Sequence, residues 1–384
     1  MIAKRANELK DELIKIRHTL HKTPETDFVE FKTSAYIQKK LIEYGIPFEV
    51  KAMTGISAII KGKNDGKTVL LRADFDGLPI KEESGVDFSS EIDGYMHACG
   101  HDVHAACLLG AAKILNEHKN EISGNIKLIF QPAEEGAGGA LPMIKEGIME
   151  NPNVDGAFAL HVEPLENVGN IQIKDGSVMA SPDDFEIIIH GVGGHGARPE
   201  ECVNPISVGA EILRKYHTLS SDYKLPCVVT ICSFNGGSCR NAIPDTAVIT
   251  GTARSLDPIT RKKLVELLKK IASDTATDMN ASIEFNFNVL FPPVVNNSEM
   301  NKIVAESARQ LGLNITYLTK PSMAGDDFSY FGERVPSSYF KLGVGNETIG
   351  AIYPIHSPKF KADDRALPLG AAIMAQSALN FLNK

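Results

Sequence analysis

The sequence predicts an α/β protein that carries a second, smaller domain inserted into its chain. Three apolar stretches, at residues 68–72, 125–130 and 154–160, have the composition of buried strands, and helical patterns lie between them. From residue 184 to 290 the order becomes strand, helix, strand, strand, helix, strand, which is the ferredoxin-like split βαββαβ motif. A chain of 384 residues is long enough for two domains, each with its own core.

This change of pattern gives the expected domain boundaries. Residues 1–180 form the first segment of the larger domain, residues 181–291 the inserted domain, and residues 292–384 the second segment. Helices are predicted at the start of the chain, over 5–22 and 32–44, because apolar residues recur on one face of the first. The inserted domain and the second segment therefore each begin where the pattern of predicted strands and helices changes.

Composition excludes several classes of protein. Acidic residues outnumber basic ones, 48 to 40, for a formal charge of −8, and no basic cluster marks a nucleic-acid surface. The N-terminal stretch is a charged amphipathic helix rather than a signal peptide, and no apolar run approaches the length of a membrane span. Six cysteines without an export signal favour free thiols, so we expect a cytoplasmic protein that binds neither nucleic acid nor membrane.

The stretch MHACGHDVH, residues 96–104, predicts a metal site. It places one thiol and three imidazoles within eight positions, and an apolar helical pattern follows: the four residues are His97, Cys99, His101 and His104. Gly100 lets the backbone bend so that Cys99 and His101 can face one point. No second pair of cysteines suggests a closed structural zinc knot, so the density of ligand-type residues favours a metal site.

Polar residues also follow the three predicted strands. Asp74 and Asp76 end the first, where a carboxylate could bind a metal or orient a ligating imidazole, although Asp76 fits a simple turn residue equally well. Glu134 and Glu135 follow the second, where one could bind a metal while the other takes a proton from water. An acidic turn that favours a helix dipole is the alternative for this pair. His161 ends the third strand, so each strand terminus carries a metal-competent residue.

Two further histidines lie in loops. His195 sits in the glycine-rich GVGGHGARP, where a core histidine is out of place, and we expect it to be functional. The inserted domain also contains SCRNAIPD, with Arg240 and Asn241. His356, in YPIHSPKF, could complete the metal shell.

Taken in order and spacing, these motifs resemble a known family. RADFDGLP, MHACGHDVHA, QPAEEGAGGA, GGHGARP, NAIPD and IHSPKF are similar to the motifs of the two-metal aminoacylase and carboxypeptidase superfamily, over essentially the whole chain. The branch that the chain resembles contains hippurate hydrolases, N-acyl-amino-acid amidohydrolases, auxin-conjugate hydrolases and N-acetyl-diaminopimelate deacetylases. The resemblance implies a mixed-sheet α/β metallopeptidase catalytic domain with an inserted lid and dimerisation domain.

The resemblance also implies two divalent metal ions, manganese or zinc, with cobalt or nickel as further options. Their ligands would be Cys99, His101, Glu135, His161 and His356. Cys99 would bridge both metals, Glu134 would be the general base, and Asp74 would support the ligands from behind. His97 and His104 have no ligand role in the family pattern, so we expect them to be supporting or structural residues.

For the inserted domain the resemblance implies contacts to substrate. His195 would help stabilise the oxyanion, in its own subunit or in the partner's active site of a homodimer, and Asn241 would contact the substrate carboxylate. Glu200 and Asn204 stand where many relatives carry histidine and aspartate, so the substrate preference of this loop stays open.

The implied reaction is metal-dependent hydrolysis of N-acyl amino acids, such as N-acetyl or N-benzoyl compounds, to a carboxylate and a free amino acid. A metal-activated water would attack, with Glu134 as the base. A metallo-carboxydipeptidase acting on short peptides uses the same chemistry and is the alternative. A non-catalytic binding protein is disfavoured by the intact ligand set, and a thiol switch at Cys99 would need an exposed thiolate of low pKa.

Overall fold

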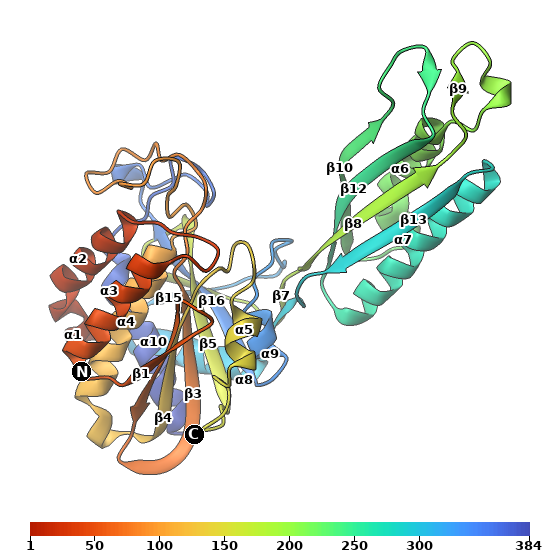
Figure 1. The fold of residues 1–384 in the computed structure, drawn as a ribbon. Coiled ribbons are helices and arrows are strands. Elements are labelled where there is room, and N and C mark those ends of the chain that lie inside the picture. Colours follow the sequence, from red (N-terminus) through yellow and green to blue (C-terminus); the bar gives the residue numbers. More distant parts are fainter. The chain divides into compact units, whose positions relative to one another are not determined.

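The computed structural model describes all residues, 1–384, and the chain divides into two compact units (Figure 1). Unit 1 comprises Met1–Gly176, Val295–Thr319 and Tyr330–Lys384, and unit 2 comprises Ser177–Val294 and Lys320–Ser329. The second, short segment of unit 2 has no counterpart in the sequence pattern. The strands β7 (Gly176–Met179) and β14 (Val294–Asn296) lie where the chain passes between the units.

Unit 1 is built on a mixed eight-stranded sheet in the order β1-β2-β4-β3-β5-β16-β6-β15. Its four central strands run parallel to one another: β4 (Ser123–Gln131), β3 (Asn64–Asp74), β5 (Gly156–Asn167) and β16 (Ser337–Gly345). The outer strands are β1 (Phe48–Lys51), β2 (Gly55–Lys61), β6 (Asn170–Ile173) and β15 (Asn314–Tyr317). Because the central strands are parallel, the residues that follow them meet at one edge of the sheet.

Helices pack on this sheet through a single hydrophobic cluster. They are α1 (Ile2–Glu8), α2 (Lys10–His21), α3 (Phe31–Tyr44), α4 (His101–Glu117), α8 (Ser298–Gln310) and α10 (Ala366–Leu382), with the short α5 (Ala140–Lys145) and α9 (Ser329–Gly332) elsewhere in the chain. The single N-terminal helix expected over residues 5–22 is in fact two helices that meet at Leu9. No helix combines the length and the apolar character that crossing a bilayer requires.

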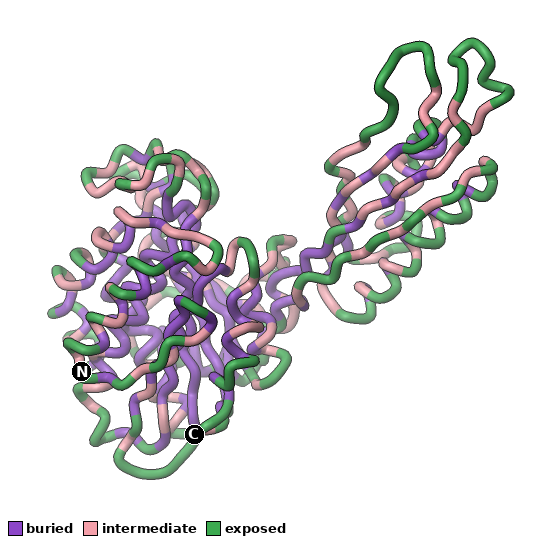
Figure 2. The backbone as a smooth tube through the Cα atoms, in the orientation of Figure 1, coloured by how far each residue is buried: buried purple, intermediate pink, exposed green.

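Helix α4 lies at the centre of this cluster, packed against α10, α2 and β3. Nearly every residue from His101 to Leu115 is buried, which explains why the sequence of this helix is apolar on all sides. Figure 2 shows buried backbone concentrated in the interior of unit 1. The core thus fixes the start of α4, with His101 in its first turn and Cys99 just before it, against the carboxyl edge of the sheet.

Unit 2 has the predicted order strand, helix, strand, strand, helix, strand. Its antiparallel sheet runs β10-β12-β8-β13, from β8 (Ser181–His190), β10 (Cys227–Gly236), β12 (Thr246–Ser255) and β13 (Ser282–Val289). Two helices, α6 (Pro205–Asp222) and α7 (Pro258–Asp278), pack on one face around alternating strand residues such as Phe185, Ile187 and Ile189. A separate pair, β9 (Gly194–His195) and β11 (Ala242–Ile243), holds the two loops that carry His195 and Asn241.

Candidate metal centre

The centre begins at the turn that leads into α4. Gly100 is the N-cap residue of this helix and has a φ of 84°, in the left-handed region that favours glycine. A Cβ atom at this position would lie 2.6 Å from Cγ2 of Val162, so a larger residue would also collide with β5. The glycine therefore lets Cys99 and His101 come close to the strand that carries His161.

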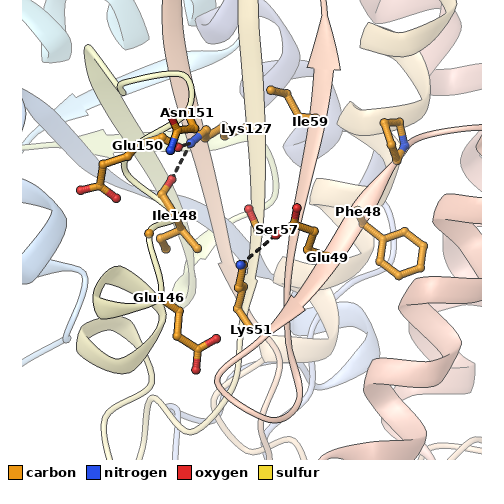
Figure 3. Close-up of a pocket in the computed structure, with 12 residues that line it drawn as sticks. Phe48, Glu49, Lys51, Ser57, Ile59, Lys127, Glu146, Ile148, Glu150 and Asn151 are labelled. Atoms are coloured by element: carbon orange, nitrogen blue, oxygen red, sulfur yellow. Dashed lines mark hydrogen bonds and ion pairs between the residues drawn. The ribbon is translucent and has the colours of Figure 1, made fainter.

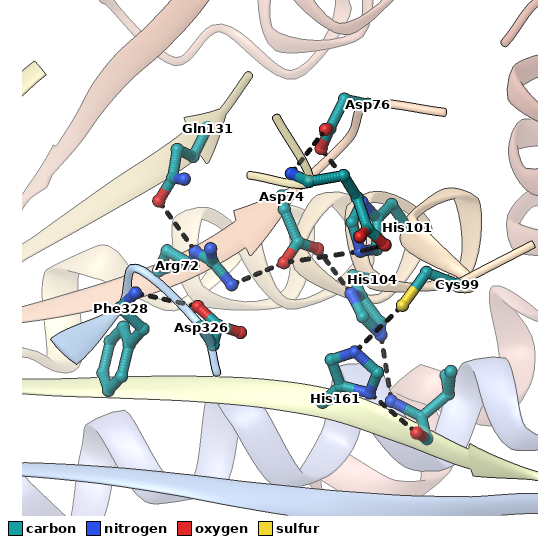
Figure 4. A network of polar contacts seen from close by, with 12 residues as sticks. Arg72, Asp74, Asp76, Cys99, His101, His104, Gln131, His161, Asp326 and Phe328 are labelled. Carbon is teal, nitrogen blue, oxygen red and sulfur yellow. Dashed lines mark hydrogen bonds and ion pairs between the residues drawn. The ribbon is translucent and has the colours of Figure 1, made fainter. Parts of the chain in front are cut away.

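Cys99, His101 and His161 form one group of buried ligand-type side chains (Figure 4). One ligand atom from each lies within 4.8 Å of the others, and Cys99 Sγ is 3.4 Å from His161 Nε2. His161 Nδ1 donates to the carbonyl oxygen of Val162 at 2.8 Å, so Nε2 carries the lone pair and faces the Cys99 thiol. Burial, with the neighbouring His104, holds the pKa of His161 well below its usual range, so the imidazole is in its neutral, metal-binding form.

Cys99, Glu135 and His356 form a second group with the same spacing. His356 Nε2 lies 3.1 Å from Glu135 Oε1, and its backbone amide donates to the carbonyl of Ala98 at 2.9 Å. His356 has a φ of 63°, a strained backbone that this hydrogen bond helps to hold. The two groups share Cys99, which is the arrangement that a bridging thiolate would need.

The surroundings of His101 and Cys99 show whether the two ligand groups suit a bound cation. His101 Nε2 is buried and has no hydrogen-bond partner, although buried nitrogens rarely lack one. Burial lowers the pKa of His101, but Asp74, Asp76 and Glu135 outweigh it and raise the pKa to about 10, so its surroundings favour positive charge. Burial, with Glu135 and Glu134, raises the pKa of the Cys99 thiol well above its usual value, and a nearby divalent cation would reverse that shift. The donor set fits a two-metal centre.

Asp76 holds two of these residues at once. Its Oδ1 accepts from His101 Nδ1 at 3.0 Å and its Oδ2 accepts from the backbone amide of Glu135 at 3.0 Å. The sequence left this residue undecided between support and turn. The spacing of Asp74 and Asp76 was the available signal, since residues two apart on an extended chain point the same way.

Asp74 lies behind His101, further from the proposed metal ligands than Asp76. It contacts His104 Nδ1 and Arg72 Nη1, both at 2.5 Å, and its nearer oxygen is 3.8 Å from His101 Nε2. Burial raises the pKa of Asp74, but Arg72, His101 and His104 hold it well below the usual range. His104 Nε2 in turn accepts from the backbone amide of Val162 at 2.9 Å. Asp74 and His104 thus connect the centre to β5, beside His161.

Glu134 and Glu135 come from the turn after β4. Both are half-buried, and one oxygen of each lies within 4.8 Å of a ring nitrogen of His101. Burial raises the pKa of Glu135, but the hydrogen bond from His356 and the charge of His101 lower it below its usual value. Two carboxylates beside one imidazole allow the division of labour that the sequence suggested, with one as ligand and one as base.

His195 and Asn241 are brought together within unit 2. His195 lies opposite Ala242 in the β9–β11 pair, and the carbonyl of Asn241 accepts from the amide of Gly196 at 2.9 Å. The backbone amide of Ala197 donates to His195 Nδ1 at 3.1 Å, which leaves Nε2 as the nitrogen that carries the proton. Both side chains are exposed, as residues that reach for a ligand would be.

A pocket of about 350 Å³ elsewhere in unit 1 lacks such unsatisfied groups (Figure 3). Its two lysines are already partnered: Lys51 pairs with Glu49 at 2.8 Å, and Lys127 donates to the carbonyls of Ile148 and Glu150 at 2.8 and 2.5 Å. The metal centre is therefore the better candidate for chemistry.

The sheet of unit 1 is mixed, and the carboxyl ends of its parallel central strands bring together a thiol, imidazoles and paired carboxylates. This combination defines an α/β metallohydrolase. The chain belongs to peptidase family M20/M25/M40, whose model matches residues 70–380. Membership makes the protein a hydrolase of linear amide or peptide bonds.

Individual relatives span nearly the whole chain. The chain is 40% identical to thermostable carboxypeptidase 2 of Saccharolobus solfataricus, over 98% of its own length and 97% of that protein. It is 35% identical to the N-acetyl-L-cysteine deacetylase of Bacillus subtilis, over 98% and 89%. The crystal structure of Bacillus subtilis YxeP, described as a dinuclear metal-binding peptidase of the M20 family, matches with a TM-score of 0.88 at 32% identity, over 98% and 99% of the two chains.

Proposed function

We propose that the protein hydrolyses the amide bond of N-acyl amino acids with two divalent metal ions per subunit. The observation that carries this proposal is the pair of ligand groups that share Cys99. One ion would be held by Cys99, His101 and His161, and the other by Cys99, Glu135 and His356. The mixture of sulfur, nitrogen and oxygen donors suits manganese or zinc, with cobalt or nickel as further options.

In the proposed mechanism, ions held by these residues would lower the pKa of the attacking water and would polarise the amide carbonyl. Glu134 accepts a proton from that water and later donates it to the amine as the C–N bond breaks. Asp76 holds the ring of His101 and the backbone of Glu135 in place while the charges change. Asp74 acts through His104, so it positions β5 and does not touch the reacting atoms.

Unit 2 supplies the remaining roles. We assign His195 to the developing oxyanion, in the same subunit or in the partner of a homodimer, and Asn241 to the substrate carboxylate. Unit 2 would thus serve as a lid and dimerisation domain, with the protein acting in the cytoplasm.

Cleavage of short peptides by a carboxypeptidase is the second candidate. It is favoured by the 40% identity to a thermostable carboxypeptidase. The chemistry at the metals is the same, but the pocket must then accept a free amine near the scissile carbonyl. The two candidates therefore differ in the substrate and not in the residues of the centre.

The test is release of free amine from N-acetyl, N-benzoyl and longer N-acyl amino acids, with dipeptides in the same panel. The apo protein is reconstituted with manganese or with zinc, and bound metal is counted in each sample. We expect metal-dependent cleavage of one class of N-acyl amino acid. Cleavage of dipeptides alone would establish the second candidate, and a fully metal-loaded protein that cleaves nothing would refute both.

A further inference from the structure

Glu30, the residue before α3, is a buried carboxylate that joins three loops of unit 1. Its side chain is fully buried, at 0% exposure. Oε1 accepts from the backbone amides of Phe28 at 3.1 Å and Ala133 at 3.2 Å, and Oε2 accepts from Thr54 Oγ1 at 2.7 Å. Because Ala133 immediately precedes Glu134, one side chain ties the N-terminal loop and residues 52–54 to the turn that carries both glutamates.

The backbone of these three loops is strained. Nine residues other than glycine have a positive φ in the chain, and five of them lie here: Asp27, Phe28, Ala52, Met53 and Ala133, with φ between 46° and 66°. Such conformations cost free energy and persist only where the surrounding structure holds them, and they collect at functional sites. Glu30 accepts hydrogen bonds from Phe28 and Ala133, which are two of these strained residues, and from Thr54, which follows Ala52 and Met53.

A second contact joins the same segment to the far side of the turn. A Cβ atom at Gly136 would lie 2.1 Å from Asp27 Oδ1, so this carboxylate packs directly against the glycine. Within the turn, the amide of Gly138 donates to the carbonyl of Ala133 at 2.8 Å. The turn over residues 133–138 is thus closed on itself and held from outside at Ala133 and at Gly136.

We propose that Glu30 is a positioning residue, whose hydrogen bond to the Ala133 amide fixes the turn that presents Glu134 and Glu135 to the metal centre. The proposal rests on the proposed roles of these two glutamates. The hydrogen bond from Glu30 reaches this turn at the backbone amide of Ala133, directly before Glu134. Since a misplacement of about 1 Å can cost about 10²-fold in rate, loss of this anchor should reduce turnover more than substrate binding.

Two conservative variants separate the effect of side-chain length at position 30 from the effect of its charge. Glu30→Asp keeps the charge, but its shorter side chain cannot span all three donors. Glu30→Gln loses the charge and keeps the reach: its oxygen can accept from Phe28 and Ala133, and its NH₂ can donate to the Thr54 hydroxyl. Burial raises the pKa of Glu30, so a neutral group at this position is physically reasonable. The matched control is Glu25→Asp, because Glu25 also accepts three hydrogen bonds, from Lys32 and Thr33, at the start of α3.

The first measurement is hydrogen exchange of peptides that cover residues 132–138, which does not depend on activity. We expect these peptides to exchange about 10-fold faster in Glu30→Asp than in the wild type. In Glu30→Gln and Glu25→Asp, we expect them to exchange at the wild-type rate. The second is kcat and KM with the metal content of each sample. We expect kcat of Glu30→Asp to fall about 10- to 100-fold with KM within about 3-fold and two ions bound, and Glu30→Gln to retain most of the rate.

Unchanged exchange in Glu30→Asp, or an equal loss of rate in Glu25→Asp, would overturn the proposal. So would an active Glu30→Asp beside an inactive Glu30→Gln, because charge and not position would then matter. If the wild type cleaves no substrate of the panel, the proposed function fails, while hydrogen exchange and metal content still decide the role of Glu30.

Discussion

The metal centre of unit 1 and the β9–β11 loops of unit 2 hold their functional side chains in opposite ways. The two buried imidazoles of the centre each have a partner behind them, Asp76 for His101 and the carbonyl of Val162 for His161, whereas His356 is an exposed loop residue. His195 and Asn241 are exposed, and a two-residue strand pair supports them through backbone hydrogen bonds. The buried part of the proposed metal centre is thus built into the core, while the residues proposed to meet a varying substrate lie at the surface.

The comparison predicts that changes in the two regions will have different signatures. In unit 1 a substitution of a proposed ligand, or of a residue that holds one in place, should alter metal binding or folding together with activity. In unit 2 a substitution at the exposed loops should alter activity alone, because surface side chains contribute little to stability. Four experiments test this difference.

Glu134→Gln should have the largest effect. Removal of a general base typically costs about 10²- to 10⁴-fold in rate, and glutamine fills the same space without accepting the proton. We expect two ions to remain bound, because Glu134 is not one of the proposed ligands. The matched variant is Glu135→Gln at the neighbouring position, where we expect metal loss as well. Rate measurements with metal analysis check both, and a fully active Glu134→Gln protein would remove Glu134 as the base.

His195→Ala should follow, with a fall in kcat of about 10²- to 10³-fold if His195 stabilises the oxyanion. Its side chain is exposed, so we expect the free energy of unfolding to change by less than about 0.5 kcal/mol. The control is His190→Ala, which removes a histidine of the same unit that pairs only with Glu284 at the surface. Denaturant unfolding and steady-state kinetics on the same samples decide the matter. Equal rates for the two variants would contradict the assignment.

The contrast between the regions also explains what the sequence could predict. The strand ends and the ligand stretch stood out because metal ligands must be of a few residue types, close in sequence or at the ends of buried strands. Asp76 was undecided, because a turn aspartate and a supporting aspartate look alike until the partner of each oxygen is known. Glu30 was missed entirely, since its partners at Thr54 and Ala133 are far away in the chain.

The same reasoning applies to the fold. Alternating apolar residues predicted the strand and helix order of unit 2, because each element is amphipathic. The break at Leu9 between α1 and α2 was not visible, since the apolar face continues through it. Nor was the assignment of Lys320–Ser329 to unit 2, which depends on long-range contacts and not on local pattern.

Asp76→Asn should produce an intermediate effect and would sharpen the distinction between the two aspartates. An asparagine must offer NH₂ in place of one carboxylate oxygen, so either His101 Nδ1 or the Glu135 amide would face a donor. Loss of such a supporting partner typically costs about 10- to 100-fold in metal affinity or activity. Competition with a chelator measures the affinity.

The control for that experiment is Asp155→Asn, at the opposite end of the same sheet, where the Asp155 carboxylate accepts the amide of Thr68 at 2.7 Å. We expect this variant to bind metal as the wild type does. If Asp76→Asn also binds metal normally, Asp76 is not the residue that orients His101 for the metal.

His21 should affect stability without a direct effect on turnover at neutral pH. Both of its ring nitrogens donate, to Asp102 at 2.9 Å and to Glu82 at 3.1 Å, beside the buried Arg17. Burial lowers the pKa of His21, but Asp102 and Glu82 outweigh it and raise the pKa to about 9. The folded protein therefore binds this proton more tightly than the unfolded chain, whose histidines titrate near pH ~6.5.

A raised pKa fixes the sign of the pH dependence. The stabilisation by His21 is fully present below about pH 6.5 and is lost as the pH rises through about 9, with a total of roughly 3 kcal/mol. Between about pH 6 and pH 10, the wild type should therefore lose roughly 3 kcal/mol more of its free energy of unfolding than His21→Gln does. Urea unfolding of both proteins at the two pH values measures this difference. Parallel losses in the two proteins would mean that His21 is neutral in the fold and that Asp102 is satisfied by Arg17 alone.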